Sequence, residues 1–305
     1  IMINTLFIFI KRNIKLFFKD KGLFFVSLIT PIILLILFVT FLANVYEDSF
    51  RSAINAISPD LVVSDCVYKG LVGGQLVSSL LSVCCITVAF CSNMVMVQDK
   101  ATGTEKDFLV SPVKPSVLAL GYYVATFINT LIVALTAVLC CLAYLAVNGW
   151  FLTGADVMLL FLDVVTLVFF GTALSSVINI FLSTQAQISA VSSVISSMYG
   201  FICGAYMPMS QFPEWLSSLL LFLPGTYGTV LLRRHCLSGA LSALEQSGAS
   251  TAVTDSLKDI ADLNVAFPGG TQPVTEAAVY VLFAAIIAVL VIAYILLTKY
   301  VKNKK

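Results

Sequence analysis

Long uninterrupted apolar runs alternate with short polar breaks along most of the chain. Several runs exceed the roughly 20 residues that a helix needs to cross the hydrocarbon core of a bilayer. They lack the alternation of apolar and polar positions that is typical of transmembrane β-strands. The pattern predicts an all-α membrane protein with six transmembrane helices, over residues 22–44, 70–97, 116–147, 155–182, 188–207 and 276–298.

The segment before the first of these runs has a different pattern. Apolar residues recur at helical spacing, whereas Lys11, Lys15 and Lys19 follow one another at intervals of four on another face. This pattern predicts an amphipathic basic helix over residues 1–21 that lies on the membrane surface.

Two longer polar regions lie between the predicted spans. Residues 46–69 carry charges of both signs and predict an exposed loop. In residues 208–275, Pro224-Gly225 divides two apolar arms, each too short to cross a bilayer. We therefore expect a re-entrant helical hairpin over residues 212–235 that is sheltered by other parts of the protein. A polar segment would follow it.

Composition and charge agree with a membrane protein. Of the 305 residues, 59% are hydrophobic and 11% are charged, and the mean hydropathy is +1.01. A soluble domain carries about 25% charged residues. The net charge of +1 gives no indication of a nucleic-acid partner.

The positions of Lys and Arg predict how the chain is oriented. Twelve of the 17 lie in residues 1–21, in the polar break 98–115 or after residue 298. Since Lys and Arg are enriched on the cytoplasmic side, we expect both termini and the break 98–115 in the cytoplasm. Residues 46–69 and 208–275 would then lie outside. The whole chain, 1–305, would be a single transmembrane domain in the plasma membrane of a bacterium.

Motifs for chemistry within the chain are sparse. The sequence contains no G-x-x-x-x-G-K-[ST], no G-x-S-x-G and no H-E-x-x-H, and it has one histidine. We predict no catalytic, cofactor or metal site here, so ATP could act only through another chain. Six of the eight cysteines fall in apolar runs. The other two, Cys66 and Cys236, are both expected outside and could pair.

Two groups of motifs resemble those of ABC-2 type transporter permeases. The first is Gly103-Thr104, with Phe108 five residues on and Ser111-Pro112 after it. The second is the run from Gly204 to Leu216, followed by Leu223-Pro224-Gly225-Thr226-Tyr227. One departure is Glu105-Lys106, where many members carry an apolar residue and then Glu.

The resemblance implies one half of an exporter that works as a dimer, with itself or a paralogous permease. ATP-binding cassette subunits, which bind ATP and Mg²⁺, would be its partners, along with membrane lipids. The break 98–115 would be the coupling loop, with an ordinary solvated loop as the alternative. Its candidate residues are Asp99, Lys100, Gly103, Thr104, Glu105, Lys106, Asp107, Phe108, Leu109, Ser111 and Pro112.

Small residues in the second and fifth spans allow close helix approach. They could line the dimer interface and substrate path or simply pack within one chain. The candidates are Gly73, Gly74, Ser78, Ser82, Ser189, Ser193, Ser196 and Ser197. Asp163 joins them as an acid well inside a span, where it could contact substrate or form a structural bond.

The predicted hairpin supplies a further set of candidates: Pro213, Trp215, Pro224, Gly225, Tyr227, Arg233 and Arg234. The two arginines could meet anionic groups or anchor at the interface. The resulting prediction is an ATP-driven exporter of an amphipathic or lipid-linked substrate, such as a drug or antibiotic, a lipid or a glycan. The alternative is a secondary transporter or channel, from which several intramembrane charges or an inverted repeat would be expected.

Overall fold

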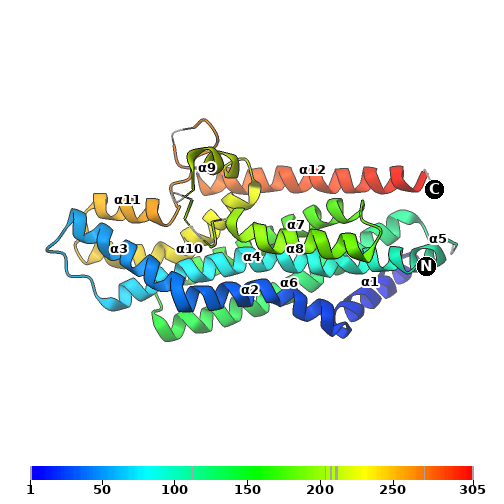
Figure 1. Ribbon diagram of the computed structural model, residues 1–305, viewed down its shortest axis with the longest axis horizontal. Coiled ribbons are helices and arrows are strands. Elements are labelled where there is room, and N and C mark those ends of the chain that lie inside the picture. Colours follow the sequence, from blue (N-terminus) through cyan, green and yellow to red (C-terminus); the bar gives the residue numbers. More distant parts are fainter. Residues whose placement is uncertain are drawn as a thin grey trace.

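The structure is a computed structural model, and it describes residues 2–110, 113–202, 204–206, 208–209, 212–270 and 272–303. The described part is helical, apart from an isolated antiparallel bridge between Ala266 and Pro273. Most of the long helices run along the long axis of an elongated bundle (Figure 1). The chain termini and helix α5 lie at one end, which we call the termini end, and α3 and α11 lie toward the other, the far end.

The chain begins with α1 (Met2–Lys19) and turns at Asp20, whose carboxylate accepts a hydrogen bond from the backbone N–H of Leu23. Helix α2 (Lys21–Leu37) then continues through a π-helical turn (Phe38–Leu42) into α3 (Ala43–Ile57). The prediction of an exposed loop starting at residue 46 was therefore wrong. Tyr46, Phe50 and Ile54 are buried at intervals of four, so an amphipathic helix forms despite its charges.

Helix α4 (Asp65–Ala101) is the centre of the bundle and contacts α2, α6, α7, α8 and α10. Nearly all of its apolar window, 94%, is buried inside the chain. It extends beyond both ends of the predicted span 70–97. Helices α5 (Thr104–Val110), α6 (Pro115–Asn148) and α7 (Gly154–Asn179) follow it.

The region after α7 departs further from the predicted boundaries. Helix α8 (Gln185–Ile202) ends before the predicted boundary at residue 207. Helices α9 (Glu214–Leu220) and α10 (Pro224–Gln246) are bent by 84° at the Pro-Gly break, so the bend was predicted but the limit at residue 235 was wrong. Helix α10 continues because Leu237, Ala240, Leu241 and Leu244 keep an apolar face buried.

The last two helices are α11 (Thr251–Ile260), in the region expected to be polar, and α12 (Glu276–Asn303). Among the described residues, five helices are long and apolar enough to cross a membrane, or six if α9 and α10 form one broken span. The chain therefore has the multi-pass helical architecture that its hydropathy predicts.

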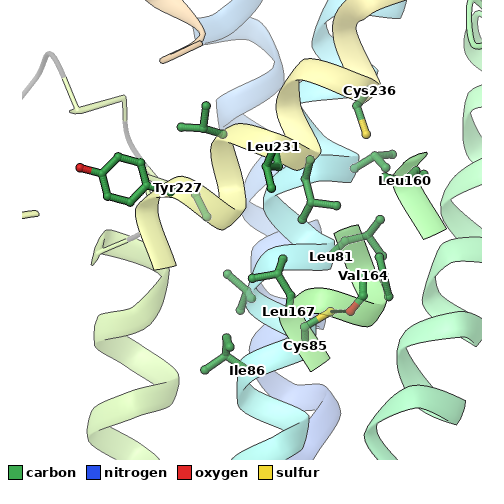
Figure 2. Close-up of a cluster of buried hydrophobic side chains, with 14 of the residues drawn as sticks. Leu81, Cys85, Ile86, Leu160, Val164, Leu167, Tyr227, Leu231 and Cys236 are labelled. Carbon is green, nitrogen blue, oxygen red and sulfur yellow. Dashed lines mark hydrogen bonds between the residues drawn. The ribbon is translucent and has the colours of Figure 1, made fainter. Parts of the chain in front are cut away.

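Buried side chains join α4, α7 and α10 at the middle of the bundle. Figure 2 shows Leu81, Cys85 and Ile86 of α4 among residues of the two neighbouring helices. Those residues are Leu160, Val164 and Leu167 of α7, and Tyr227, Leu231 and Cys236 of α10. Further apolar clusters lie on either side, one around α3, α10 and α11 and the other around α1 and α6.

Candidate functional site

An ion pair between a half-buried arginine and a buried aspartate joins α1 to α4 at the termini end. The guanidinium of Arg12 donates two hydrogen bonds to the carboxylate of Asp99, at 2.7 and 2.8 Å. The hydroxyl of Tyr122 in α6 donates a third at 2.6 Å. Asp99 is 6% exposed, so these donors compensate its charge where water cannot. One carboxylate thus fixes three helices relative to one another.

Aromatic packing attaches α5 to the same point. The Phe108 ring meets the edge of Phe9 in α1, with centroids 5.2 Å apart, and Phe9 also packs against Tyr122. The guanidinium of Arg12 lies 5.1 Å from the centroid of the Phe108 ring, within range of a cation–π interaction. Helix α5 is therefore held by side chains of α1 as well as by its chain connection to α4.

Lys100 adds α7 to this junction. Its ammonium donates hydrogen bonds to the backbone carbonyls of Asn179, Ile180 and Leu182, at 3.2, 2.9 and 3.4 Å. Carbonyls at the end of a helix lack partners within the helix and carry partial negative charge, so a lysine there is stabilising. We call the group of Phe9, Arg12, Asp99, Lys100, Phe108 and Tyr122 the termini-end junction.

The junction changes the interpretation of several candidate coupling residues. Asp99, Lys100 and Phe108 were expected to contact a partner, but in the structure their side chains bond or pack within the chain. The reason is that groups of the same chain lie beside these side chains. Arg12 contacts Asp99 and Phe108, and the carbonyls at the end of α7 accept from Lys100. Among the α5 side chains that the structure describes, Asp107 and Val110 are exposed, the latter to 89%.

The remaining residues of the predicted loop are placed as follows. Gly103 joins α4 to α5 with φ +83°, a conformation that favours glycine. The hydroxyls of Thr104 and Thr102 share a hydrogen bond of 3.0 Å, and Glu105 is half-buried. Ser111 and Pro112 lie outside the described residues, as do the side chains of Lys106 and Leu109.

A second polar cluster lies between α7, α10 and α12. The carboxylate of Asp163 is 1% exposed, shares a 2.6 Å hydrogen bond with Nδ1 of His235, and accepts a 2.5 Å hydrogen bond from Tyr280. Nε2 of His235 lies 3.5 Å from a carboxylate oxygen of Glu276. One turn along α10, Ser238 donates to Asp156 of α7 at 2.7 Å. Asp163 therefore holds helices together, which is the structural alternative considered from the sequence.

Arg233 anchors the bend of α10 from inside the protein. Its side chain is fully buried, pairs with Asp262 at 3.0 Å, and donates to the carbonyl of Gly204. Asp262 also accepts hydrogen bonds from the Met209 N–H, at 3.0 and 3.2 Å. Burial raises the pKa of the Asp262 carboxyl, although Arg233 and the Met209 N–H both favour its ionised form.

Neither arginine of the pair lies free at an interface, as the sequence had suggested. Arg234 donates to the carbonyls of Leu263 and Val274, at 2.8 and 2.6 Å. Both arginines thus fasten the segment after α11 onto α10. These contacts replace the expected interfacial anchor or anion site, because that segment folds back over α10.

The other hairpin candidates define the bend between α9 and α10. Pro213 precedes α9 and Pro224 is the first residue of α10. Gly225 packs against the ring of Tyr199, and Tyr227 donates to the carbonyl of Leu221 at 2.6 Å. Trp215 is 70% exposed, a position typical of a membrane-interface anchor.

Small residues of α4 pack inside the chain and do not face outward. Gly73 lies against Leu145, and Gly74 lies against the backbone of Cys236. Ser78 is fully buried, and the hydroxyls of Ser82 and Thr229 share a 2.6 Å hydrogen bond. For α4, intrachain packing therefore replaces the expected dimer interface and substrate path, because five other helices surround it.

Small residues of α8 are placed differently. Ser193 and Ser197 are exposed, beside the exposed apolar residues Val194, Met198 and Phe201. The side chains of Ser189 and Ser196 lie outside the described part. The cysteines expected to pair are both free, with Cys66 exposed and Cys236 buried.

Sequence reasoning missed the partners in these clusters. Arg12 stands among the lysines of the basic segment in the sequence, and no pattern connected it to Asp99 or connected His235 to Asp163. The partners lie on separate helices far apart in the chain, so sequence spacing carries no signal for them. Only Asp163, an acid within an apolar run, indicated by its residue type that a partner must exist.

The helices and buried polar clusters define a multi-pass membrane protein built around a central buried helix. In comparison with known families, residues 4–235 match the family ABC-2 type transporter, whose members are transmembrane permease subunits. Since the match covers more than half of the chain, the protein belongs to this family. A search of curated proteins found no match.

Proposed function

We propose that this chain is the membrane subunit of an ATP-driven exporter and receives its drive from an ATP-binding cassette partner at the termini end. Membership of the ABC-2 type transporter family supports a role in transport. The excess of Lys and Arg in the terminal segments and the break 98–115 supports a cytoplasmic termini end. ATP and Mg²⁺ would bind to the partner.

The termini-end junction is the observation that supports coupling at this place. Helix α5 presents Asp107 and Val110 outward, while Phe108 on its other side packs against α1. Asp99 and Lys100 then connect the end of α4 to α1, α6 and α7. A partner that displaces α5 would therefore act on four membrane-associated helices at once, through contacts that are buried and charge-assisted.

The exposed face of α8 supports a dimer. Val194, Met198 and Phe201 form an apolar face beside Ser193 and Ser197, and small residues next to apolar ones suit helix association in a membrane. We propose that a second copy or a paralogous permease packs there, and that an amphipathic or lipid-linked substrate moves along that interface.

A purification experiment tests the partner. Tagged protein purified from its own host membrane should retain a chain that carries a P-loop, and the pair reconstituted in liposomes should couple ATP hydrolysis to transport. Uphill transport by the purified chain alone, driven by an ion gradient, would overturn the proposal.

The docking surface is tested with one substitution and a matched control. Val110→Asp places a charge on the outward face of α5 and should weaken binding of the P-loop partner about tenfold, because the apolar contact is lost. Val62→Asp changes a valine that is equally exposed, at 90%, but lies at the far end, and it should bind the partner normally. Equal binding by both variants would place the docking surface elsewhere.

A further inference from the structure

A groove of about 650 Å³ lies between α6 and α12 at the termini end. Its deeper wall is apolar, formed by Ala119, Leu120, Val291 and Ile295. A second cavity of about 310 Å³ adjoins it and shares Ala119, Tyr294 and Thr298. The two helices diverge here because α12 packs mainly against α7 along its length. Figure 1 shows α12 along one edge of the bundle.

The groove opens on the membrane-facing side of the protein. Leu120 is 49% exposed and Ile295 is 48% exposed, and the neighbouring residues Ile292 and Leu296 of α12 are more exposed still. Only 11% of the apolar window of α12 is buried inside the chain. Side chains that are this apolar and this exposed on a spanning helix face lipid tails.

Polarity changes along the groove in the way that it changes along a phospholipid. Lys114, Ser116 and Thr298 line the mouth at the termini end, whereas Leu120 and Val291 lie about two turns deeper. Lys114 is exposed and forms no ion pair with another residue in the described part of the chain. Lys100 and Glu105 both line the adjoining cavity, so their charges offset each other and Lys114 is the charged side chain that distinguishes the mouth. The mouth is therefore suited to a negative headgroup and the interior to an acyl chain.

We propose that this groove binds one anionic phospholipid, with its phosphate against Lys114 and an acyl chain between α6 and α12. Basic positions between membrane helices at the bilayer surface attract anionic headgroups, at about 1 kcal/mol for each Lys or Arg. Tyr123 also lines the groove, and its hydroxyl makes no hydrogen bond within the described residues, so it is available to the ester region of the lipid. The proposal is independent of the ATPase partner.

Another groove on the same helix supplies a control. A cavity of about 270 Å³ between α2, α4 and α6 is lined by apolar residues that include Ala137, with Tyr144 but no charged residue. It too can accept an acyl chain. It lacks the lysine that would distinguish an anionic phospholipid from a neutral one.

The test is competition between lipids. Protein reconstituted in nanodiscs with equal phosphatidylglycerol and phosphatidylcholine is released and analysed by native mass spectrometry, which counts the lipids retained per chain. Wild-type protein should retain phosphatidylglycerol preferentially. Lys114→Gln should lower that preference about fivefold, because one basic contact is lost. Ala119→Phe should remove it by filling the groove.

Two controls make the result specific. Ala137→Phe fills the uncharged groove on the same helix, and Lys21→Gln removes an exposed lysine at the same end of the molecule. Both should keep the wild-type preference. Lys114 is exposed, so Lys114→Gln tests the proposal even if Ala119→Phe does not fold. Equal retention of both lipids by wild type, an unchanged preference in Lys114→Gln, or a second copy of the chain crosslinked across this groove would each overturn the proposal.

Discussion

Arg233 has the largest fully buried side chain in the described structure, and its contacts explain how a charge is tolerated there. Asp262 supplies the opposite charge and the carbonyl of Gly204 accepts a further hydrogen bond. Asp262 in turn has φ +54° and binds the Met209 N–H, which places the pair at a strained turn. The two side chains depend on each other.

This dependence gives a prediction for single and double variants. Arg233→Met leaves the Asp262 carboxylate buried without its counter-ion, which should lower the free energy of unfolding by about 3–5 kcal/mol. Asp262→Asn should cost a similar amount, because it leaves the Arg233 charge unpaired. The double variant should be more stable than either single one, since Asn still accepts from Met209 and tolerates positive φ. Thermal unfolding of purified protein in detergent measures all three.

An exposed ion pair provides the comparison. Arg51 bonds to Glu47 and Asp65 at 2.8 Å, but all three side chains are at least a third exposed. Arg51→Met should therefore leave the thermal unfolding midpoint close to that of the wild type, because water already screens these charges. A loss as large as that of Arg233→Met would show that burial does not set the cost.

Ion pairs of this kind mark the limit of what the sequence predicts at the residue scale. Asp163 was recognisable as an intramembrane acid that needs a partner, but His235 and Tyr280 come from helices that begin far downstream. Asp99 carried no such signal, because it lies in a polar break where a solvated charge is the ordinary interpretation. Asp99 is buried because α1 packs beside α4 and α6. That packing belongs to the tertiary structure and leaves no pattern in the sequence.

At the scale of the element, α4 shows why glycine and serine occur in the middle of a transmembrane helix. A Cβ added to Gly74 would lie 2.7 Å from the carbonyl oxygen of Cys236 in α10. Backbone atoms cannot move aside to make room, as the end of a flexible side chain can. The close approach of α4 and α10 therefore requires glycine at this position.

Gly74→Ala should for this reason separate the two helices and lower the free energy of unfolding by about 1–3 kcal/mol. Gly154→Ala is a matched control on an exposed first turn, where no atom lies within 4 Å of the added Cβ. It should be neutral or slightly stabilising. Both are measured as shifts in thermal unfolding, and equal behaviour would contradict close packing at Gly74.

Hydropathy predicted the existence of the long helices better than their ends. The apolar runs indicated the middle of each span, because a helix segment needs apolar residues there whether it is buried in lipid or in protein. Helix α3 was missed, since Tyr46, Phe50 and Ile54 are spaced by four among charged residues and the charges dominated the interpretation. The extension of α10 was visible in the same way, through Leu237, Leu241 and Leu244, but only the partners α3 and α11 make that face buried.

At the scale of the whole molecule, hydrogen bonds hold α12 to the bundle near each of its ends. Near the start of α12, Tyr280 donates to Asp163 of α7. Near the termini end, Tyr294 donates to the carbonyl of Ala119 in α6 at 3.2 Å and lies 3.8 Å from the sulfur of Met96. Between these points α12 presents much of its surface to lipid. The two contacts are about 21 Å apart along the helix.

Separate attachments at this distance should contribute independently. Tyr280→Phe removes a hydrogen bond to a carboxylate and should cost about 1.5–3 kcal/mol, and Tyr294→Phe should cost about 1 kcal/mol. The double variant should show their sum to within about 0.5 kcal/mol. Tyr123→Phe is the control, since its hydroxyl has no hydrogen-bond partner in the described part of the chain and its loss should be neutral in detergent. A double variant no less stable than Tyr280→Phe alone would mean that α12 detaches as one unit once the Tyr280 contact is lost, so that α7 alone determines its position.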